Sequence, residues 1–342
     1  MKTNLKFSPE VLEIDPATVA HEIETSIREG ISQRLKRKGA VLGLSGGIDS
    51  SVATALCVRA LGKDRVLGLF MPEADSGQDT LRLGRLLADV LQIRTAFEDI
   101  TPILRAARCY QRRDDAIRLV VPQYGEGWKC KLVLPNLLDG SFYPLHSIVV
   151  RSPAGVETRT RLTAEAYLGI VAATSFKQRI RKMIEYYYAD RLNYAVVGTP
   201  NRLEYDQGFF VKNGDGAADL KPIAHLYKTQ VYQLGKYLDI PSEIQQREPT
   251  TDTYPLHQSQ EEFYFALPYD KIDLCLYGTN HGIPAADVAS ATGLTVEQAA
   301  QAYRWIEAKR SATHYLHMPP LLVENVGRDV SEGASRAPGK AK

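Results

Sequence analysis

Apolar residues recur at every fourth position near the start of the chain. They are Val19, Ile23, Ile27, Ile31 and Leu35. Because a helix turns once in about 3.6 residues, this spacing places all of them on one face. The pattern therefore predicts an amphipathic helix over residues 17–38, which Gly39 ends.

Short apolar runs alternate with helical periods along much of the chain. Strands are predicted at residues 40–44, 65–71, 94–98 and 194–199. Helices are predicted at residues 50–60, 81–91, 175–190, 229–238 and 295–309. Such alternation is typical of a parallel sheet that is covered by helices on both faces. We therefore expect an α/β fold built on a doubly wound, mostly parallel sheet.

Proline and glycine interrupt every candidate helix between about residues 108 and 163. Within this stretch, residues 147–151 and 156–161 are joined by a short turn and predict a β-hairpin. We expect an insertion that folds against the main sheet. Residues 1–325 would then form one domain. Residues 326–342 have almost no aliphatic or aromatic side chains and are expected to form a disordered tail.

The composition excludes several classes of protein. In 342 residues, 42 Lys and Arg residues face 40 Asp and Glu residues, and a formal net charge of +2 argues against a dedicated nucleic-acid binder. No apolar run is long enough for a membrane span, and the first residues do not resemble a secretory signal. Cys57, Cys109, Cys130 and Cys275 are isolated, which favours reduced packing residues. We expect a cytoplasmic protein.

The segment VLGLSGGIDSS joins a predicted strand to a predicted helix, where free amides and the helix dipole bind anions. Gly46 and Gly47 let the backbone approach an oxygen-rich group closely. Ser45 and Ser50 add hydroxyl groups. The carboxylate of Asp49 would repel phosphates unless Mg²⁺ lay between them, and magnesium prefers one or two carboxylates together with phosphate oxygens.

This segment does not match two common phosphate-binding loops. The G-x-x-x-x-G-K-[ST] loop needs a lysine that is missing here, and the dinucleotide fingerprint G-x-G-x-x-G is absent. A glycine-rich turn that binds no ligand is the remaining alternative. The clustering of serine, glycine and aspartate at a strand-to-helix junction favours a phosphate site.

The S-G-G-x-D-S pattern resembles the pyrophosphate loop of the N-type ATP pyrophosphatases, whose members adenylate a substrate and release pyrophosphate. Residues 196–231, 247–252 and 267–278 resemble NAD synthetase. The segment SFKQRIRKMIEYY resembles that family's N-x-x-x-R-x-R helix, with Ser175 in place of Asn. The resemblance implies an adenine nucleotide alpha hydrolase-like fold and the amidation of deamido-NAD through an acyl-adenylate, using ATP and ammonia.

The resemblance also implies roles for individual residues. The residues expected to bind ATP are Gly43, Ser45, Gly46, Gly47, Ser50, Thr199, Lys228 and Thr250. Asp49 and Glu204 are expected to share Mg²⁺. The residues expected to bind deamido-NAD are Arg179, Tyr186, Lys212, Asp215, Asp219 and His314. No protein nucleophile is needed, because positioning and electrostatic stabilisation carry this chemistry. A homodimer is implied as well.

Several of these residues could instead have purely structural roles. Arg179 and Lys212 could be solvated surface charges, and Tyr186 could be a packing residue. The two aspartates of NGDGAAD could cap a turn. His314 could be an ordinary surface histidine.

The chain departs from the family at Tyr315, where a lysine that follows histidine is expected. The insertion's Arg112, Arg113 and Arg118 are candidates to replace the lost charge. No glutaminase is expected, so ammonia would be used directly or supplied by a separate amidotransferase. A divergent ligase for another carboxylic acid is the main alternative. A tRNA-modifying enzyme would be expected to carry paired reactive cysteines and a basic face, and a non-catalytic binder to lack the two acidic residues.

Overall fold

The computed structural model describes residues 7–134, 146–251, 253–265 and 267–324. At its centre is a four-stranded parallel sheet in the order β3-β2-β1-β7. Its strands are β1 (Ala40–Gly43), β2 (Val66–Phe70), β3 (Arg94–Phe97) and β7 (Ala195–Val196). Alternate side chains enter different cores, with Leu42 and Phe70 on one face and Val41 and Leu69 on the other. The predicted α/β fold is confirmed.

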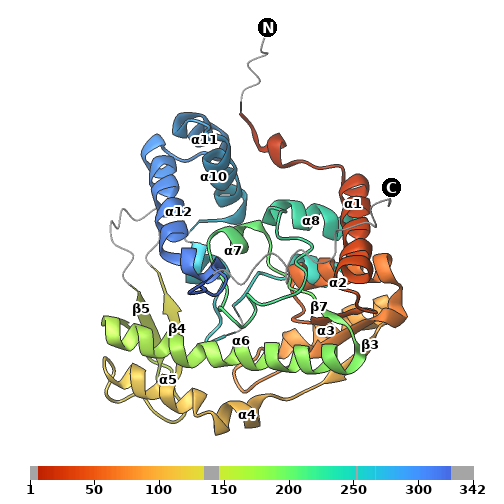
Figure 1. Cartoon of the computed structure of the whole chain (residues 1–342). Helices are drawn as coiled ribbons and strands as arrows, with labels where there is room; N and C mark the ends of the chain where they lie inside the picture. Colours follow the sequence, from red (N-terminus) through yellow and green to blue (C-terminus); the bar gives the residue numbers. More distant parts are fainter. Residues whose placement is uncertain (1–6, 135–145, 252, 266, 325–342) are drawn as a thin grey trace, which may run out of the picture.

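Helices cover both faces of this sheet (Figure 1). The helices whose apolar residues join the core on one face are α1 (Pro16–Arg28), α2 (Ile48–Leu61), α3 (Gln78–Leu91), α8 (Lys228–Tyr237) and α9 (Ser242–Gln246). The other face packs against α4 (Thr101–Ala106) and α6 (Ala164–Leu192). The helix predicted at 17–38 is α-helical only to Arg28, and Glu29–Arg34 form a wider π-helical turn.

The predicted insertion forms a second, antiparallel sheet beside α6. It contains α5 (Cys109–Arg118) and the strands β4 (Lys129–Val133), β5 (Ser147–Arg151) and β6 (Glu157–Arg161), in the order β4-β5-β6. The predicted hairpin is therefore confirmed, whereas the expectation that no helix forms here is wrong. The insertion packs on α6 more than on the main sheet itself, because Ile117 and Ile148 share a core with Ile170 of that helix.

The C-terminal helices surround a core of their own. They are α7 (Arg202–Asp206), α10 (Tyr269–His281), α11 (Ala285–Thr292) and α12 (Val296–His317). Single turns occur at η1 (Pro9–Leu12), η3 (Lys63–Arg65) and η5 (Glu261–Phe265). Within the described ranges, no helix combines the length and the apolar character that a membrane crossing requires. All four cysteines are buried as free thiols. The tail predicted at 326–342 lies outside the described residues.

Candidate active site

A cavity of about 570 Å³ lies where the strands of the main sheet end. Gly43 at the end of β1, Met71 just after β2 and Thr199 just after β7 all line it. The carboxyl ends of parallel strands are where doubly wound folds bind their ligands. The cavity therefore lies where the sequence predicted a nucleotide site.

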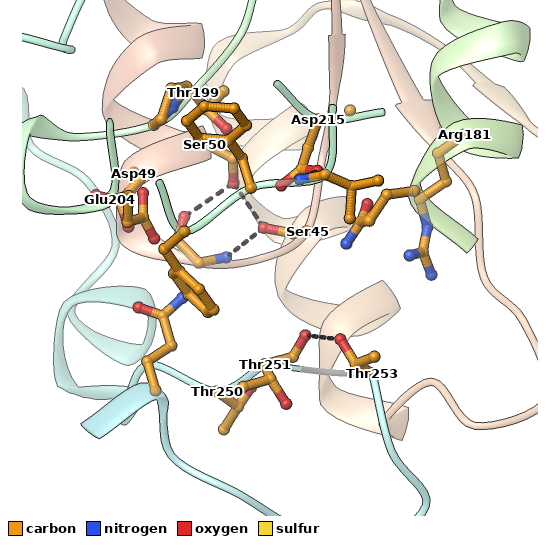
Figure 2. A pocket seen from close by; sticks show the side chains of 18 of the residues that line it. Ser45, Asp49, Ser50, Arg181, Thr199, Glu204, Asp215, Thr250, Thr251 and Thr253 are labelled. Atoms are coloured by element: carbon orange, nitrogen blue, oxygen red, sulfur yellow. Dashed lines mark hydrogen bonds between the residues drawn. The ribbon is translucent and has the colours of Figure 1, made fainter. Parts of the chain in front are cut away.

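The glycine-rich loop forms one wall of this cavity (Figure 2). The amide of Gly47 donates to Ser45 Oγ at 3.3 Å, and Ser50 Oγ lies 3.0 Å from the same oxygen. Gly46 has a φ of +67°, and a Cβ built there would lie 2.8 Å from the Thr80 carbonyl oxygen. Only glycine fits both the conformation and the space at this position.

The loop leads directly into α2, whose N-terminus carries the positive end of the helix dipole. Gly47 is the N-cap residue, and no side chain among the described residues caps this end. The first amides of the helix therefore remain available to an anion.

Asp49 and Glu204 lie far apart in the sequence, yet both line this cavity. They are held there by one residue, Asn201. Its Nδ2 donates to Asp49 Oδ1 at 2.9 Å, and its backbone amide donates to Glu204 Oε2 at 3.1 Å. Lys228 Nζ forms an ion pair with Asp49 Oδ2. The predicted meeting of the two carboxylates in one cavity is therefore present in the structure.

Sequence reasoning missed Asn201, although the sequence carried a signal for it. Asn201 and Glu204 form a capping box at the start of α7, in which the Asn201 side chain also accepts from the Glu204 amide at 3.1 Å. An Asn followed three residues later by Glu is typical of such a box. The capping interaction fixes Glu204, and the side-chain amide of the same asparagine reaches Asp49.

Burial governs the charges of this acidic pair. It raises the pKa of Glu204 to about 8, and the nearby Asp49 carboxylate acts in the same direction. Burial also opposes the charge of Lys228, but the two carboxylates outweigh it, so the pKa of Lys228 lies above its usual value. The single ammonium group of Lys228 therefore faces two acidic side chains, and this arrangement suits an additional cation.

The two carboxylates fit Mg²⁺ in type and number. In the parts of the chain that the structure describes, no three His, Cys, Asp or Glu side chains cluster as a metal site. A magnesium ion held by Asp49 and Glu204 would therefore take its other ligands from phosphate or water, as magnesium commonly does.

Several residues predicted to bind substrates line the cavity. Besides those already described, they are Arg179, Lys212, Asp215 and Thr250. Lys212 Nζ donates to the carbonyl oxygens of Tyr315 and Met318, at 2.6 and 3.0 Å, and so caps the end of α12. It also lies 5.6 Å from the centre of the Tyr315 ring. Tyr315, the departure from the family pattern, therefore contacts a predicted substrate residue.

Three of the residues predicted to bind deamido-NAD do not line the cavity of the single chain, and neither does Gly46 of the glycine-rich loop. Tyr186 OH donates to Asp219 Oδ1 at 3.3 Å, and Asp219 Oδ2 accepts from the Val196 amide at 2.8 Å. His314 lies in the last turns of α12 and is not among the residues that line the cavity, although the next residue, Tyr315, is. Their roles in binding deamido-NAD stay predictions.

The arginines of the insertion lie outside the cavity of the single chain. Arg113 is buried and pairs with Asp75 at 2.6 Å, and Arg118 pairs with Asp115 at 2.6 Å. Arg112 lies over the ring of Phe176. None of these arginines lines the cavity. Within the single chain, α5 directs these arginines to other partners, so their compensation for Tyr315 stays a prediction.

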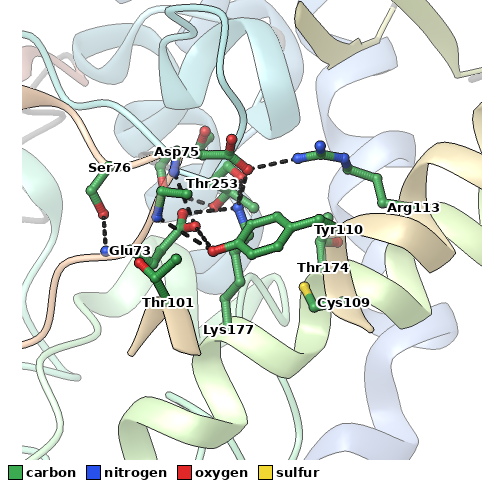
Figure 3. Close-up of polar contacts among 12 residues, drawn as sticks. Glu73, Asp75, Ser76, Thr101, Cys109, Tyr110, Arg113, Thr174, Lys177 and Thr253 are labelled. Atoms are coloured by element: carbon green, nitrogen blue, oxygen red, sulfur yellow. Dashed lines mark hydrogen bonds and ion pairs between the residues drawn. The ribbon is translucent and has the colours of Figure 1, made fainter. Parts of the chain in front are cut away.

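A buried charge network adjoins the cavity-lining residue Thr253 (Figure 3). Lys177 of α6 is 1% exposed, and its Nζ contacts Glu73 Oε1 at 2.8 Å, Asp75 Oδ2 at 2.7 Å and the Thr253 carbonyl oxygen at 2.6 Å. Arg113 joins through Asp75. The network therefore links α5, α6, the loop after β2 and the cavity-lining segment around Thr253. Sequence reasoning missed it because its members lie far apart in the chain.

The chain is similar to known proteins in both sequence and fold. A sequence model of the family described as NAD synthase matches residues 19–121 and 153–319. The chain is 57% identical over 325 residues to the NH(3)-dependent NAD(+) synthetase of Rhizobium meliloti (strain 1021), covering 95% of this chain and 97% of the relative. It is also 57% identical over 319 residues to the protein of the same name from Mesorhizobium japonicum, covering 93% of this chain and 100% of the relative.

Among solved structures, the fold resembles that of NMN synthetase from Francisella tularensis. The TM-score is 0.63 at 24% sequence identity, covering 91% of this chain and 99% of that chain. This likeness concerns the fold. The family model leaves residues 122–152 unmatched, a shorter stretch than the insertion predicted from about 108 to 163.

Proposed function

The chain belongs to the NAD synthase family, and from this premise we propose that it converts deamido-NAD to NAD with ATP and ammonia. The observation that carries the proposal is the common cavity of the glycine-rich loop, Asp49 and Glu204 at the carboxyl ends of the strands. Relatives named NH(3)-dependent NAD(+) synthetase, similar over nearly their whole length, support the same reaction.

The reaction has two steps, and both need orientation more than a protein nucleophile. The carboxylate of deamido-NAD attacks the α-phosphorus of ATP, the bond to the bridging oxygen breaks, and pyrophosphate leaves. Ammonia then attacks the carbonyl carbon of the acyl-adenylate, loses a proton and expels AMP, which forms the amide. Holding two anionic substrates in line accounts for most of the catalysis.

Different residues of the cavity would bind the phosphates and the metal ion. The amides at the start of α2 and the hydroxyls of Ser45 and Ser50 would bind phosphate oxygens, and Thr250 would add a hydroxyl from the opposite wall. Asp49 and Glu204 would hold Mg²⁺, which neutralises phosphate charge when bound. Lys228 would balance the two carboxylates and approach the phosphates as a point charge.

We also propose that two copies of the chain associate through α6. Leu168, Met183 and Tyr187 on this helix are 63%, 57% and 58% exposed, and a second copy of the chain would cover these large apolar side chains. Tyr186, a predicted deamido-NAD residue outside the cavity, directly precedes Tyr187. The mass in solution by light scattering tests the proposal: the wild type should be a dimer, and Tyr187→Glu should shift it toward a monomer.

The identity of the carboxylic acid is tested by pyrophosphate release. The purified protein would receive ATP, Mg²⁺ and ammonium with one acid at a time, including deamido-NAD, nicotinate mononucleotide and amino acids with side-chain carboxylates. Deamido-NAD should stimulate release most strongly. Stimulation by another acid, with none by deamido-NAD, would instead favour a ligase of the same fold for that acid.

A further inference from the structure

Arg247 lies where three cavity-lining segments meet. Its Nη1 donates to the Ser45 carbonyl oxygen at 3.1 Å, and its Nη2 donates to Thr80 Oγ1 at 2.9 Å and more weakly to Thr250 Oγ1 at 3.5 Å. Arg247 and all three partners line the cavity. One guanidinium group therefore joins the glycine-rich loop, α3 and the segment after α9.

The charge of Arg247 is not neutralised by these contacts. Its partners are a carbonyl and two hydroxyl groups, and it forms no ion pair with a carboxylate of the described ranges. Arg82 of α3 differs, since it pairs with two carboxylates, Asp79 of the same helix and Glu243 of α9. A guanidinium group has five N–H donors, so Arg247 retains donors for a ligand.

The position of Arg247 suits an anion at the loop. A Cβ built on Gly46 would lie 3.2 Å from Arg247 Nη1, so the cation directly adjoins the turn whose amides bind phosphate. Arg247 follows α9 without a linker, and Ile244 anchors that helix as a fully buried residue of the core. The side chain is therefore presented from a fixed backbone, which lowers the entropy lost on binding.

The position of Arg247 in the cavity indicates which phosphates of ATP it would contact. Its partner Thr250 lies across the cavity from Asp215, which is expected to bind the second substrate (Figure 2). The α-phosphate must face that second substrate, because the carboxylate attacks there. The phosphates that point away from the attacking group are the leaving ones.

We propose that Arg247 binds the β- and γ-phosphate oxygens of ATP and holds the pyrophosphate as it leaves; this rests on the proposed function. When the bond between the α-phosphorus and the bridging oxygen breaks, the electron pair stays on that oxygen and the negative charge of the pyrophosphate grows. A planar guanidinium group can donate two parallel hydrogen bonds to such an anion. Arg247 would thus stabilise the leaving group more strongly than the ground state.

The test is the binding of magnesium pyrophosphate and of AMP, each measured by calorimetry without the second substrate. Arg247→Met should weaken pyrophosphate binding by about 10- to 100-fold, as expected for the loss of charge-assisted hydrogen bonds. In the same variant, the affinity for AMP should change by less than about threefold, because AMP lacks the β- and γ-phosphates. Arg247→Lys should fall between, since lysine keeps the charge but not the fork.

Arg82→Met is the matched control, because it removes a nearby arginine that also contacts α3 but does not line the cavity. It should bind both ligands as the wild type does. Equal weakening of pyrophosphate and AMP in Arg247→Met, unchanged pyrophosphate binding, or no binding of pyrophosphate by the wild type would overturn the proposal. If Arg247→Met does not fold, Arg247→Lys and Arg247→Gln decide in the same assay.

The two binding measurements can fail independently of the proposed function. A wild type that binds pyrophosphate through Arg247 but never amidates deamido-NAD would contradict only the assignment of the substrate. A wild type that makes NAD, together with an Arg247→Met variant that binds pyrophosphate normally, would contradict only the role of Arg247.

Discussion

Individual side chains of the site depend on partners that come from distant parts of the chain. The glycine-rich loop and its aspartate were recognisable from the sequence because they form one short motif with a local physical reason. Asn201 was recognisable in principle from its capping box. Arg247 was not, because its partners Ser45 and Thr80 are identified only once the chain has folded.

Replacing Asp49 tests the acidic pair. Asp49→Asn keeps the shape of the side chain but removes a charge that would hold Mg²⁺, so pyrophosphate release should fall by about 100-fold or more. The protein should stay folded, because Glu204 can ionise and neutralise Lys228. The rate of pyrophosphate release and a thermal unfolding curve measure the two effects. Asp79→Asn, on the exposed face of α3, is the control. A wild-type rate in Asp49→Asn would refute its role.

Replacing Gly46 tests the shape of the phosphate loop. Gly46→Ala adds a Cβ that would lie 2.8 Å from a backbone oxygen, at a φ of +67°. ATP binding, measured by calorimetry, should weaken strongly, and stability should fall by about 1–2 kcal/mol. Gly62→Ala is a matched control, since Gly62 has a φ of +87° and open space around it. It should lose stability but keep ATP affinity. Equal ATP affinity in both variants would show that this turn does not bind the nucleotide.

Among the helices and strands, those of the main sheet were mostly predictable from the sequence, but the attachment of the insertion was not. Residues 195–196 form a shorter strand than expected, since the chain turns toward the cavity soon after them. α5 was missed because Pro and Gly nearby suggested an irregular segment, although residues 109–118 contain neither. The insertion packs on α6 because that helix starts well before the predicted residue 175, at Ala164, and offers Ile170 as a core residue.

The buried charge network should stabilise this attachment. Lys177→Met leaves Glu73 and Asp75 without their shared ammonium group, so the free energy of unfolding should fall by about 3–5 kcal/mol. Urea unfolding measures it. Lys131→Met breaks a more exposed pair with Glu262 and should cost about 0–1 kcal/mol. Similar losses in the two variants would show that the network does not hold the elements together.

The stability of the molecule as a whole should depend on pH through His146, which burial keeps neutral. Burial lowers the pKa of His146 from 6.5 to about 4. Between these values the unfolded chain binds a proton that the folded protein does not, so the folded state loses stability as the pH falls from 6.5 toward 4. Because solvent partly screens this residue, its titration should lower the free energy of unfolding at pH 5 by about 1 kcal/mol.

Urea unfolding at pH 7 and pH 5 checks this dependence. On acidification, the free energy of unfolding of His146→Gln should fall by about 1 kcal/mol less than that of the wild type, because glutamine does not titrate. His257, whose side chain is 72% exposed, provides the control, and His257→Gln should follow the wild type. If His146→Gln also follows the wild type, His146 does not carry the effect.

If one cavity adenylates the carboxylate with ATP and ammonia then attacks the acyl-adenylate, the products identify the reaction. The most direct measurement supplies ATP, deamido-NAD and ¹⁵N-labelled ammonium to the purified protein and identifies every product by mass spectrometry and phosphorus NMR. We predict NAD that carries the heavy nitrogen in its amide, with AMP and pyrophosphate formed in equal amounts. Formation of ADP and inorganic phosphate, or NAD without the label, would contradict this reaction.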